Sequence, residues 1–223
     1  MKKKSNKLTT IILPVVAIII MMVVVVMMMG LDPSSKEVPL PGLVSAEGED
    51  ILVNLEKQYR ELNPNIKGVL LEFSDFECPF CATAQSTVGA LRTVYGDTLP
   101  VVFMHFPLEQ IHPHAFDAAT AAVCAKEQGK FWKYHDLLYE NNQNLDMTSL
   151  LANADVVGLD KAQFTTCLSN GTAKEQVKAD QKLGRMLGIQ GTPTFVLVVN
   201  GTVRTIEGVL PVDQFVKIVE SME

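Results

Sequence analysis

The sequence predicts an α/β fold in which a block of helices interrupts a sheet, preceded by one transmembrane helix. Three observations support the α/β class. Apolar runs of strand length occur at 67–73, 101–104 and 194–199. The segment 113–187, between the second and third runs, has the apolar spacing of helices. The first run leads directly into a Cys-Pro-Phe-Cys stretch at 78–81, and apolar residues at helical spacing follow it.

The composition suits one globular domain with additional segments. The chain has 223 residues, of which 48% are hydrophobic and 20% are charged. The net charge is −6, but four of the 19 basic residues lie at positions 1–7, before the first acid, Asp32. The remaining 15 bases against 25 acids give residues 31–223 a net charge of −10. Such an acidic domain is not expected to bind nucleic acid.

The N-terminal segment predicts a membrane anchor. Residues 1–7 are basic and polar, and Ile11–Met29 contains no charged residue. The whole apolar stretch, 8–31, roughly matches the ~30 Å hydrocarbon core of a bilayer. Because the lysines precede it, residues 1–7 are expected in the cytoplasm, and the protein is expected to cross the cell membrane once with its remainder extracytoplasmic. The alternative is a signal peptide that is cleaved near Ala46.

Residues 32–50 are predicted to form a linker, and residues 51–223 are predicted to form the folded domain. The linker contains several prolines and glycines and few large apolar residues. The domain is expected to begin with an amphipathic helix at 50–62, which Asn63-Pro64-Asn65 ends.

The first strand, 67–73, carries an acid within its apolar run. A carboxylate in such a run is costly unless it has a function, so Glu72 is a candidate for proton exchange with a nearby cysteine. The alternative is that Glu72 faces solvent at a strand end. Asp75 and Glu77 are expected to be solvated loop acids. Glu77 precedes Cys78 directly, so its charge is expected to oppose a thiolate there.

The two cysteines that follow indicate redox chemistry. Pro79 suits the first position of a helix, so a helix is expected from Pro79 to about Tyr95, with Cys78 at its N-terminus. The helix dipole lowers the pKa of a thiol at this position, and such a thiol is a good leaving group in disulfide exchange. Cys81, one turn later, is expected to be shielded. The alternatives are half of a zinc site or a purely structural bridge.

Two histidine positions admit a functional and a structural interpretation. His105 follows the second strand, where a histidine with satisfied hydrogen bonds is the simpler interpretation and a catalytic role the alternative. His112-Pro113-His114 is better explained as a helix entry than as a metal site. No metal is expected in the protein.

The helical block is expected to consist of 115–127, 130–140, 147–157, 160–168 and 172–187, with Asp160 as an N-cap. It contains Cys124 and Cys167, which are expected to form a structural disulfide in an oxidising compartment. Closing this loop stabilises the fold by about 4 kcal/mol in the chain-entropy estimate. The alternatives are a second redox-active pair or two free thiols.

The C-terminal part predicts a hairpin and a closing helix. Asn200-Gly201 separates the strands 194–199 and 202–206, and this dipeptide is a strong hairpin signal. A final helix is expected at 209–222.

Several segments together resemble the DsbA-like thiol–disulfide oxidoreductases. The resemblance covers roughly residues 66–223 and is carried by Cys78-Pro79-Phe80-Cys81, His105-Phe106-Pro107-Leu108, Gln128-Gly129-Lys130-Phe131-Trp132 and Gly191-Thr192-Pro193-Thr194-Phe195. It implies a thioredoxin fold with an inserted helical subdomain at about 113–187.

The resemblance also implies the roles of individual residues. Cys78 and Cys81 are the redox pair, and Glu72 is the buried acid beneath them. Pro193 is a cis proline that, with Thr192, contacts the substrate, and Pro79 and Phe80 belong to the same surface. Phe80 stands where the DsbA branch often has histidine, which leaves the redox potential open.

The expected function is therefore to introduce disulfides into reduced exported proteins. No prosthetic group is required, and the family implies a quinone-linked membrane oxidase as the partner that reoxidises the pair. One alternative is a disulfide reductase or isomerase with the same site. The other is a peptide-binding chaperone domain without redox turnover.

Overall fold

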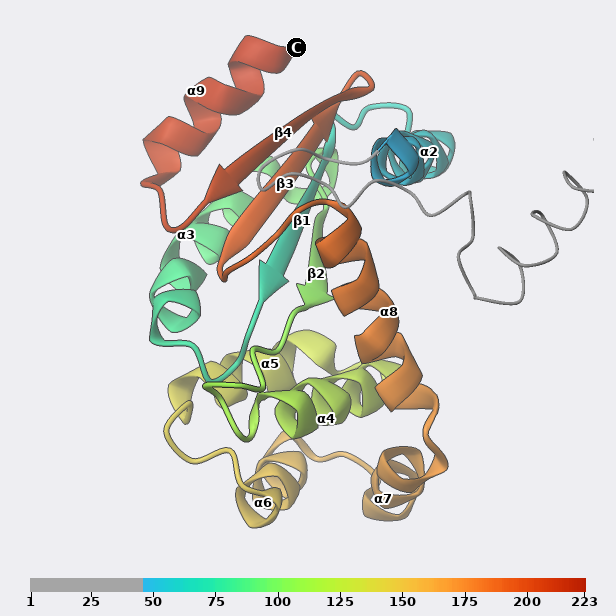
Figure 1. Cartoon of the computed structure of the whole chain (residues 1–223), viewed down its shortest axis with the longest axis vertical. Coiled ribbons are helices and arrows are strands. Elements are labelled where there is room, and N and C mark those ends of the chain that lie inside the picture. Colours follow the sequence, from blue (N-terminus) through green and yellow to red (C-terminus); the bar gives the residue numbers. More distant parts are fainter. Residues whose placement is uncertain (1–45) are drawn as a thin grey trace, which may run out of the picture. The chain divides into compact units, whose positions relative to one another are not determined.

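The computed structural model describes residues 46–223, which Figure 1 shows as coloured ribbon. The expected cytoplasmic segment 1–7, the expected membrane anchor 8–31 and residues 32–45 lie outside this range. Within residues 46–223, no helix has the length and apolar character needed to cross a membrane.

The described residues form an α/β domain with the expected order of elements. The elements are α2 (Ala46–Leu62), β1 (Val69–Ser74), α3 (Pro79–Tyr95), the short 3₁₀ helix η1 (Gly96–Thr98), β2 (Val101–His105), α4 (Ala115–Glu127), α5 (Phe131–Glu140), α6 (Met147–Val157), α7 (Lys161–Asn170), α8 (Thr172–Met186), β3 (Thr194–Val199), β4 (Thr202–Glu207) and α9 (Val212–Met222).

The strands form one four-stranded sheet in the order β2-β1-β3-β4. β1 runs parallel to β2 and antiparallel to β3, and β3 pairs with β4 as the predicted hairpin. The hairpin turn requires positive φ angles, which Asn200 (50°) and Gly201 (76°) adopt.

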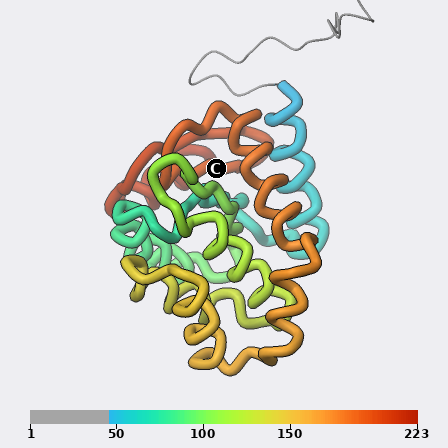
Figure 2. Tube along the Cα trace, turned by 60° about the horizontal axis from the view of Figure 1, so that its bottom comes forward, coloured from blue at the N-terminus to red at the C-terminus, as the bar shows by residue number. Residues whose placement is uncertain are grey.

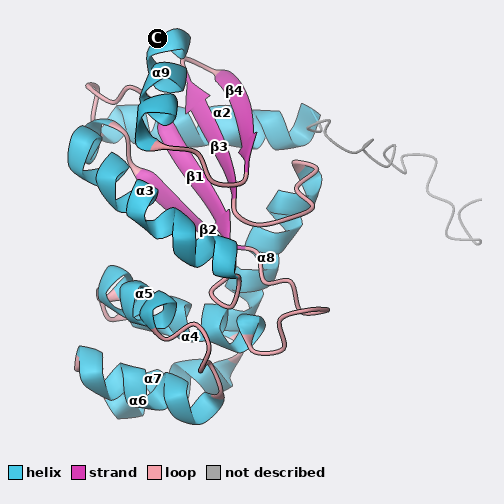
Figure 3. Cartoon of the chain, turned by 90° about the vertical axis from the view of Figure 1, so that its left-hand side faces the viewer, coloured by secondary structure: helices cyan, strands magenta, loops and turns pink. Residues whose placement is uncertain are grey.

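Helices cover both faces of the sheet (Figures 1 and 3). α3 and α9 pack on one face, where Leu70 and Phe195 contact apolar residues of both helices. α2 and α8 pack on the other face, against residues such as Leu71 and Val196. Because side chains alternate along a strand, Glu72 and Ser74 share the α3 face with Leu70.

The inserted helices form a second core at one end of the sheet. α4, α5, α6 and α7 lie together beyond the ends of β1 and β2, and α8 returns from them to the sheet beside α2 (Figure 2). A disulfide joins Cys124 of α4 to Cys167 of α7, so these cysteines are paired and not two free thiols. Asp160 caps α7 as predicted, because its carboxylate accepts a hydrogen bond from the Gln163 N–H.

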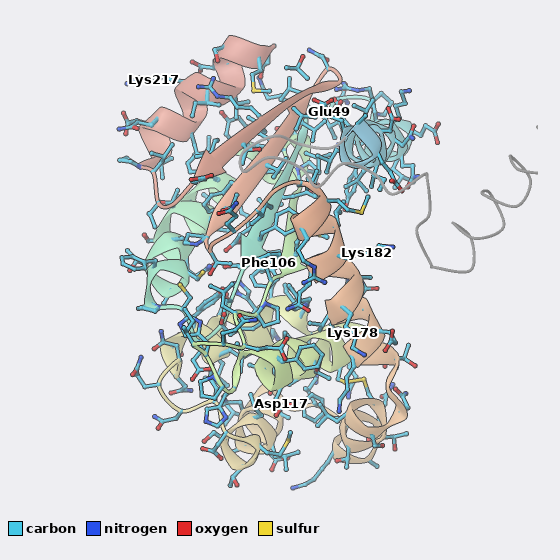
Figure 4. The ribbon with its side chains drawn as sticks, viewed as in Figure 1. Glu49, Phe106, Asp117, Lys178, Lys182 and Lys217 are labelled. Atoms are coloured by element: carbon cyan, nitrogen blue, oxygen red, sulfur yellow. A yellow bond between two sulfur atoms is a disulfide. The ribbon has the colours of Figure 1, made fainter. Side chains whose placement is uncertain are left out.

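α8 approaches the sheet at a glycine. A Cβ atom on Gly184 would lie 2.6 Å from the ring of Phe106 and 3.1 Å from that of Phe73. Figure 4 shows Phe106 beside the sheet, next to α8. The close packing of this helix therefore depends on the absence of a side chain at position 184.

Two predicted helix starts are wrong. α9 begins at Val212, three residues after the predicted start, because Pro211 precedes it as the N-cap. α2 begins at Ala46, four residues before the predicted start, so residues 46–50 belong to the helix and not to the linker. The prediction relied on apolar periodicity from Ile51 onward. The first turn of α2 contains two glutamates, Glu47 and Glu49, which suit a helix N-terminus but carry no apolar signal.

Candidate active site

The cysteine pair lies where the sequence predicts it. Cys78 is the N-cap residue of α3, Pro79 is the first helical residue, and both Cys78 and Cys81 are free thiols. Cys81 is completely buried, as expected. Cys78 is also largely buried, with 4% of its surface exposed. The Cys78 sulfur lies 3.6 Å from the Thr192 carbonyl oxygen.

The surroundings lower the pKa of Cys78 to about 5. The hydrogen bond from the Cys81 thiol is the largest cause, and the backbone N–H groups of Cys81 and Phe80 also stabilise the thiolate. Burial opposes this effect. The buried Thr192 hydroxyl makes no geometrically ideal hydrogen bond with a described residue, yet it is close enough to both sulfurs to lower their pKa values. Cys78 is therefore the nucleophile and leaving group of the pair.

The pKa of Cys81 is shifted in the opposite direction. Burial raises it most, and the neighbouring Cys78 raises it further. Cys81 consequently keeps its proton while Cys78 is a thiolate. An asymmetric pair of this kind, with one stabilised thiolate and one protonated buried thiol, is suited to thiol–disulfide exchange.

Glu72 is buried beneath the cysteines, as the resemblance implies. It has no exposed surface, which excludes the alternative of a solvent-facing strand end. One carboxylate oxygen, Oε1, accepts a hydrogen bond of 2.9 Å from the Gln85 side chain, whereas Oε2 has no hydrogen-bond partner among the described residues. Burial raises the pKa of Glu72, so the carboxyl group can hold a proton close to Cys81.

A groove beside Cys78 is the candidate substrate surface. It has a volume of about 460 Å³ and is lined by Phe80, the segments 188 and 190–194, and residues 207–209. The Thr192–Pro193 peptide bond is cis, as expected. Phe80 is 68% exposed, an unusual value for an aromatic residue. Thr192, Pro193 and Phe80 therefore meet at one surface, whereas Pro79 does not line this groove.

The expectation that Asp75 is a solvated loop acid is wrong. Its side chain is buried and accepts hydrogen bonds from the backbone N–H groups of Glu77 and Leu108. The Nδ1 atom of His112 lies 2.8 Å from its second oxygen. Asp75 thus ties the loop before Cys78 to the loop that enters α4, and sequence reasoning had no means to pair these segments.

Glu77 is also engaged, because its carboxylate accepts a hydrogen bond of 2.8 Å from the His114 N–H. Its expected opposition to the Cys78 thiolate remains a prediction. His112, Pro113 and His114 precede α4, as the helix-entry interpretation requires. Among residues 46–223, no three side chains of the metal-binding types come together.

His105 differs from the expected satisfied histidine. It is the last residue of β2 and is buried, but its Nδ1 atom has no hydrogen-bond partner within the described chain. Its backbone N–H donates to the buried Asp180 carboxylate. Burial lowers the pKa of His105 to about 3, so the ring is neutral.

Sequence reasoning missed three polar residues that surround Cys81 and Glu72, namely Ser74, His135 and Tyr139. The Ser74 hydroxyl oxygen lies 2.8 Å from the Tyr139 hydroxyl oxygen. Ser74 also acts on the pKa values of both Glu72 and Cys81. The signal that could have found them was present: His135 and Tyr139 follow Phe131 at intervals of four residues, on the apolar face of the helix.

Comparisons with known proteins identify the family and the fold. The sequence model of the thioredoxin family matches residues 63–221. A thioredoxin-like oxidoreductase from Silicibacter pomeroyi DSS-3 superposes with a TM-score of 0.62 at 26% identity, over 71% of this chain and 88% of that chain. The thiol–disulfide exchange protein α-DsbA2 from Wolbachia pipientis has a TM-score of 0.62 at 16% identity, over 80% of this chain and 100% of that chain. Pseudomonas aeruginosa DsbA2 has a TM-score of 0.59 at 22% identity, over 72% and 91%.

The curated relatives are longer proteins. The Na⁺/H⁺ antiporter NhaA 1 from Mycobacterium sp. (strain KMS) is 36% identical over 151 residues, which cover 67% of this chain and 24% of the antiporter. The chain thus matches about a quarter of the length of such relatives. The solved neighbours are thiol–disulfide oxidoreductases of the DsbA type, and the matched family covers the entire sheet and both cysteines. The chain belongs to the thioredoxin family and has the fold of its DsbA-like members.

Proposed function

We propose that the protein introduces disulfides into exported proteins by dithiol–disulfide exchange at Cys78–Cys81. The observation that carries this proposal is the asymmetry of the pair, because the pKa of Cys78 is lowered to about 5 whereas that of Cys81 is raised. A stabilised Cys78 thiolate favours the reduced enzyme, so the oxidised enzyme readily transfers its disulfide to a substrate.

The reaction proceeds through a mixed disulfide. A substrate thiolate attacks the Cys78 sulfur, the Cys78–Cys81 bond breaks, and its electron pair remains on the Cys81 sulfur, which takes up a proton. A second thiolate of the substrate then attacks the substrate sulfur bound to Cys78. Cys78 leaves as a thiolate. The substrate has lost two electrons, and the cysteine pair has gained them.

The groove beside Cys78 provides the substrate contact. Thr192 offers backbone groups next to the Cys78 sulfur, and an extended peptide can pair with such a segment as an additional strand. The exposed Phe80 ring adds an apolar surface at the edge of the same groove. Contacts of this kind accept many sequences, as a general disulfide donor requires.

An extracytoplasmic location and a membrane oxidase complete the proposal. The lysines at 1–7 followed by the apolar segment 8–31 support an anchor that orients the domain outward. The Cys124–Cys167 disulfide supports an oxidising compartment. Each turnover leaves a dithiol, so a quinone-linked membrane oxidase is the proposed partner, and an anchor raises the effective concentration of the two proteins.

The redox potential of the pair tests the direction of the reaction. The full-length protein in detergent is equilibrated with glutathione buffers, and the reduced fraction is measured by alkylation and mass spectrometry. A Cys78 pKa between those of thioredoxin and DsbA predicts a potential above about −200 mV, toward the ~−120 mV of DsbA. A potential near the ~−270 mV of thioredoxin would contradict disulfide donation and indicate a reductase.

A further inference from the structure

Beneath Cys81 lies a buried polar cluster that consists of Glu72, Ser74, His135 and Tyr139. Glu72 and Ser74 alternate along β1 and face α3, and His135 and Tyr139 lie one turn apart on α5. All four residues are buried. The rings of His135 and Tyr139 lie 5.0 Å apart, and the Ser74 and Tyr139 hydroxyl oxygens lie 2.8 Å apart. The cluster therefore joins the strand beneath the cysteines to a helix of the inserted block.

Two atoms of the polar cluster have no hydrogen-bond partner within residues 46–223. They are Oε2 of Glu72 and Nε2 of His135. The other polar atoms of these side chains are engaged, since Gln85 donates to Glu72 Oε1 and His135 Nδ1 lies 2.8 Å from Asp136 Oδ1. An unpaired buried polar atom costs roughly 1–3 kcal/mol. An acid and a base that both retain such an atom in one cluster are suited to exchanging a proton.

Asp136 fixes the orientation of the imidazole ring. Its carboxylate, on the exposed side of α5, accepts the hydrogen of His135 Nδ1, which leaves Nε2 as the inward acceptor. The hydrogen bond with His135 lowers the pKa of Asp136, so this carboxylate is ionised. Aromatic rings pack around the imidazole, including Phe76, Phe103 and Trp132 at centroid distances of 5.7, 5.1 and 4.9 Å.

The exchange reaction needs a proton acceptor at this depth. Cys81 has no exposed surface, so its proton cannot pass directly to solvent. Before Cys81 can attack a mixed disulfide at Cys78, it must lose its proton. The Gln85 side-chain amide donates to both Glu72 Oε1 and the Cys81 carbonyl oxygen, which places the Glu72 carboxyl group close to Cys81. The proton of Glu72 must in turn have a destination.

We propose that His135, oriented by Asp136, takes up the proton of Cys81 through Glu72 when the dithiol is oxidised, and returns it when the disulfide is reduced. This inference rests on the proposed disulfide exchange. On oxidation, the Glu72 carboxylate accepts the Cys81 proton and passes a proton to His135 Nε2. The Cys81 thiolate then displaces the group bound to Cys78. On reduction the proton follows the reverse path, so the cluster is restored after each cycle. His135 is a proton-relay residue that acts through Glu72.

Other titratable groups act on this cluster from the neighbouring elements. They are Asp75 in the loop before α3, Cys81 and Arg92 on α3, His105 on β2, and Asp136 on α5. Arg92 and His135 both lower the pKa of Glu72, and Lys126 acts on His105.

The test separates the two chemical steps of oxidation. The reduced full-length protein in detergent is mixed with glutathione disulfide, quenched with acid, and analysed by mass spectrometry. Formation of the mixed disulfide uses Cys78 alone, whereas its resolution requires the deprotonation of Cys81. We expect His135→Asn to slow resolution by about 100-fold, the lower end of the contribution of positioned proton transfer, and to leave formation unchanged. The pH dependence of resolution should change as well.

Asp136→Asn is the second variant. Because 63% of the Asp136 side chain is exposed, this substitution tests the relay without disturbing the core. It should slow resolution by about tenfold, since the protonated ring loses its counter-charge. The exposed-acid control Asp155→Asn should resolve the mixed disulfide at the wild-type rate and pH dependence.

The outcomes distinguish the inference from the proposed function. Wild-type resolution rates in both His135→Asn and Asp136→Asn would overturn the relay, as would an equal slowing of formation and resolution, which indicates a structural role. A wild-type protein that forms no mixed disulfide, or whose potential is near about −270 mV, would overturn the proposed function instead.

Discussion

The acidity of Cys78 depends first on one neighbouring side chain, the Cys81 thiol. We therefore expect Cys81→Ala to raise the pKa of Cys78 from about 5 toward the ~8.5 of an unperturbed thiol, although the helix N–H groups remain. The measurement is the pH dependence of thiolate absorbance or of the alkylation rate. The control, Cys78→Ala, should lose this titration. If Cys78 still titrated near pH 5 in Cys81→Ala, the helix N-terminus alone would account for its lowered pKa.

Glu72 makes the stability of the fold depend on pH. Burial raises its folded-state pKa, so its contribution to stability is complete below the unfolded pKa of ~4.3 and is lost as the pH rises through the folded pKa. Glu72→Gln has no charge to bury. At pH 7.5 we expect the free energy of unfolding of this variant to exceed that of the wild type by about 1 kcal/mol or more. At pH 4 the two values should be equal.

Urea unfolding of the oxidised proteins at both pH values provides the measurement. Glu175→Gln, at an exposed glutamate on α8, is the control and should show no such gain. If Glu72→Gln and the wild type were equally stable at pH 7.5, ionisation of Glu72 would not destabilise the fold, which would contradict the prediction.

Among the site residues, the sequence predicted those whose partners lie close to them along the chain. The cysteine pair and Glu72 lie within one strand–helix unit, so their spacing alone indicates their positions. Asp75 was misjudged because its partners, Leu108 and His112, come from a distant loop. His135 was missed because a helix face shows that a residue is buried, but not which strand it will meet.

At the scale of elements, the contact between α8 and the sheet depends on one glycine. Gly184→Ala would bring a methyl group within 2.6 Å of Phe106, so we expect it to destabilise the protein by about 1–3 kcal/mol. Gly89→Ala, in the middle of α3, is the matched control. A Cβ atom at position 89 would meet nothing within 4 Å. The better helix propensity of alanine should therefore stabilise the protein by about 0.5–1 kcal/mol.

Denaturant midpoints of the two glycine variants measure this difference. If Gly184→Ala and Gly89→Ala both stabilised the protein, the packing of α8 against Phe106 would be looser than described.

The elements themselves were largely predictable. Apolar periodicity located β1, α3, α4 and the hairpin to within two residues, because each carries a continuous pattern and a local stop signal. The start of α2 was not predictable in this way, since its first turn contains only small and acidic residues. Apart from the hairpin, the strand order was not predictable in this way, because periodicity does not indicate which strands pair.

At the scale of the whole molecule, the redox state changes how stability depends on pH. The folded pKa of Cys78 is about 5, below the ~8.5 of an unfolded thiol. The stabilisation of the reduced protein is therefore complete above pH ~8.5 and is lost as the pH falls toward 5. The raised pKa of Cys81 affects the pH dependence of stability only above pH ~8.5, the pKa of an unfolded thiol.

We expect the stability of the reduced protein, relative to the oxidised one, to increase by about 2 kcal/mol between pH 5 and pH 7. Parallel urea titrations of the two redox forms measure this difference. The free energy of unfolding of Cys78→Ala, which has no thiolate at this position, should not show the increase between pH 5 and pH 7. A difference that stays constant over this range would contradict the lowered pKa of Cys78.

The order of strands in the sheet also has a consequence for the time course of folding. β1 pairs with β3, so that Phe73 meets Thr194 across the whole helical block. Contacts within the helices are local and form quickly, whereas a pairing over such a sequence separation is slow. The Cys-Pro-Phe-Cys helix can therefore form before Thr192 reaches it. A folding intermediate would already carry both thiols but would lack the groove that selects their substrate, so chemical reactivity precedes selectivity as the chain folds.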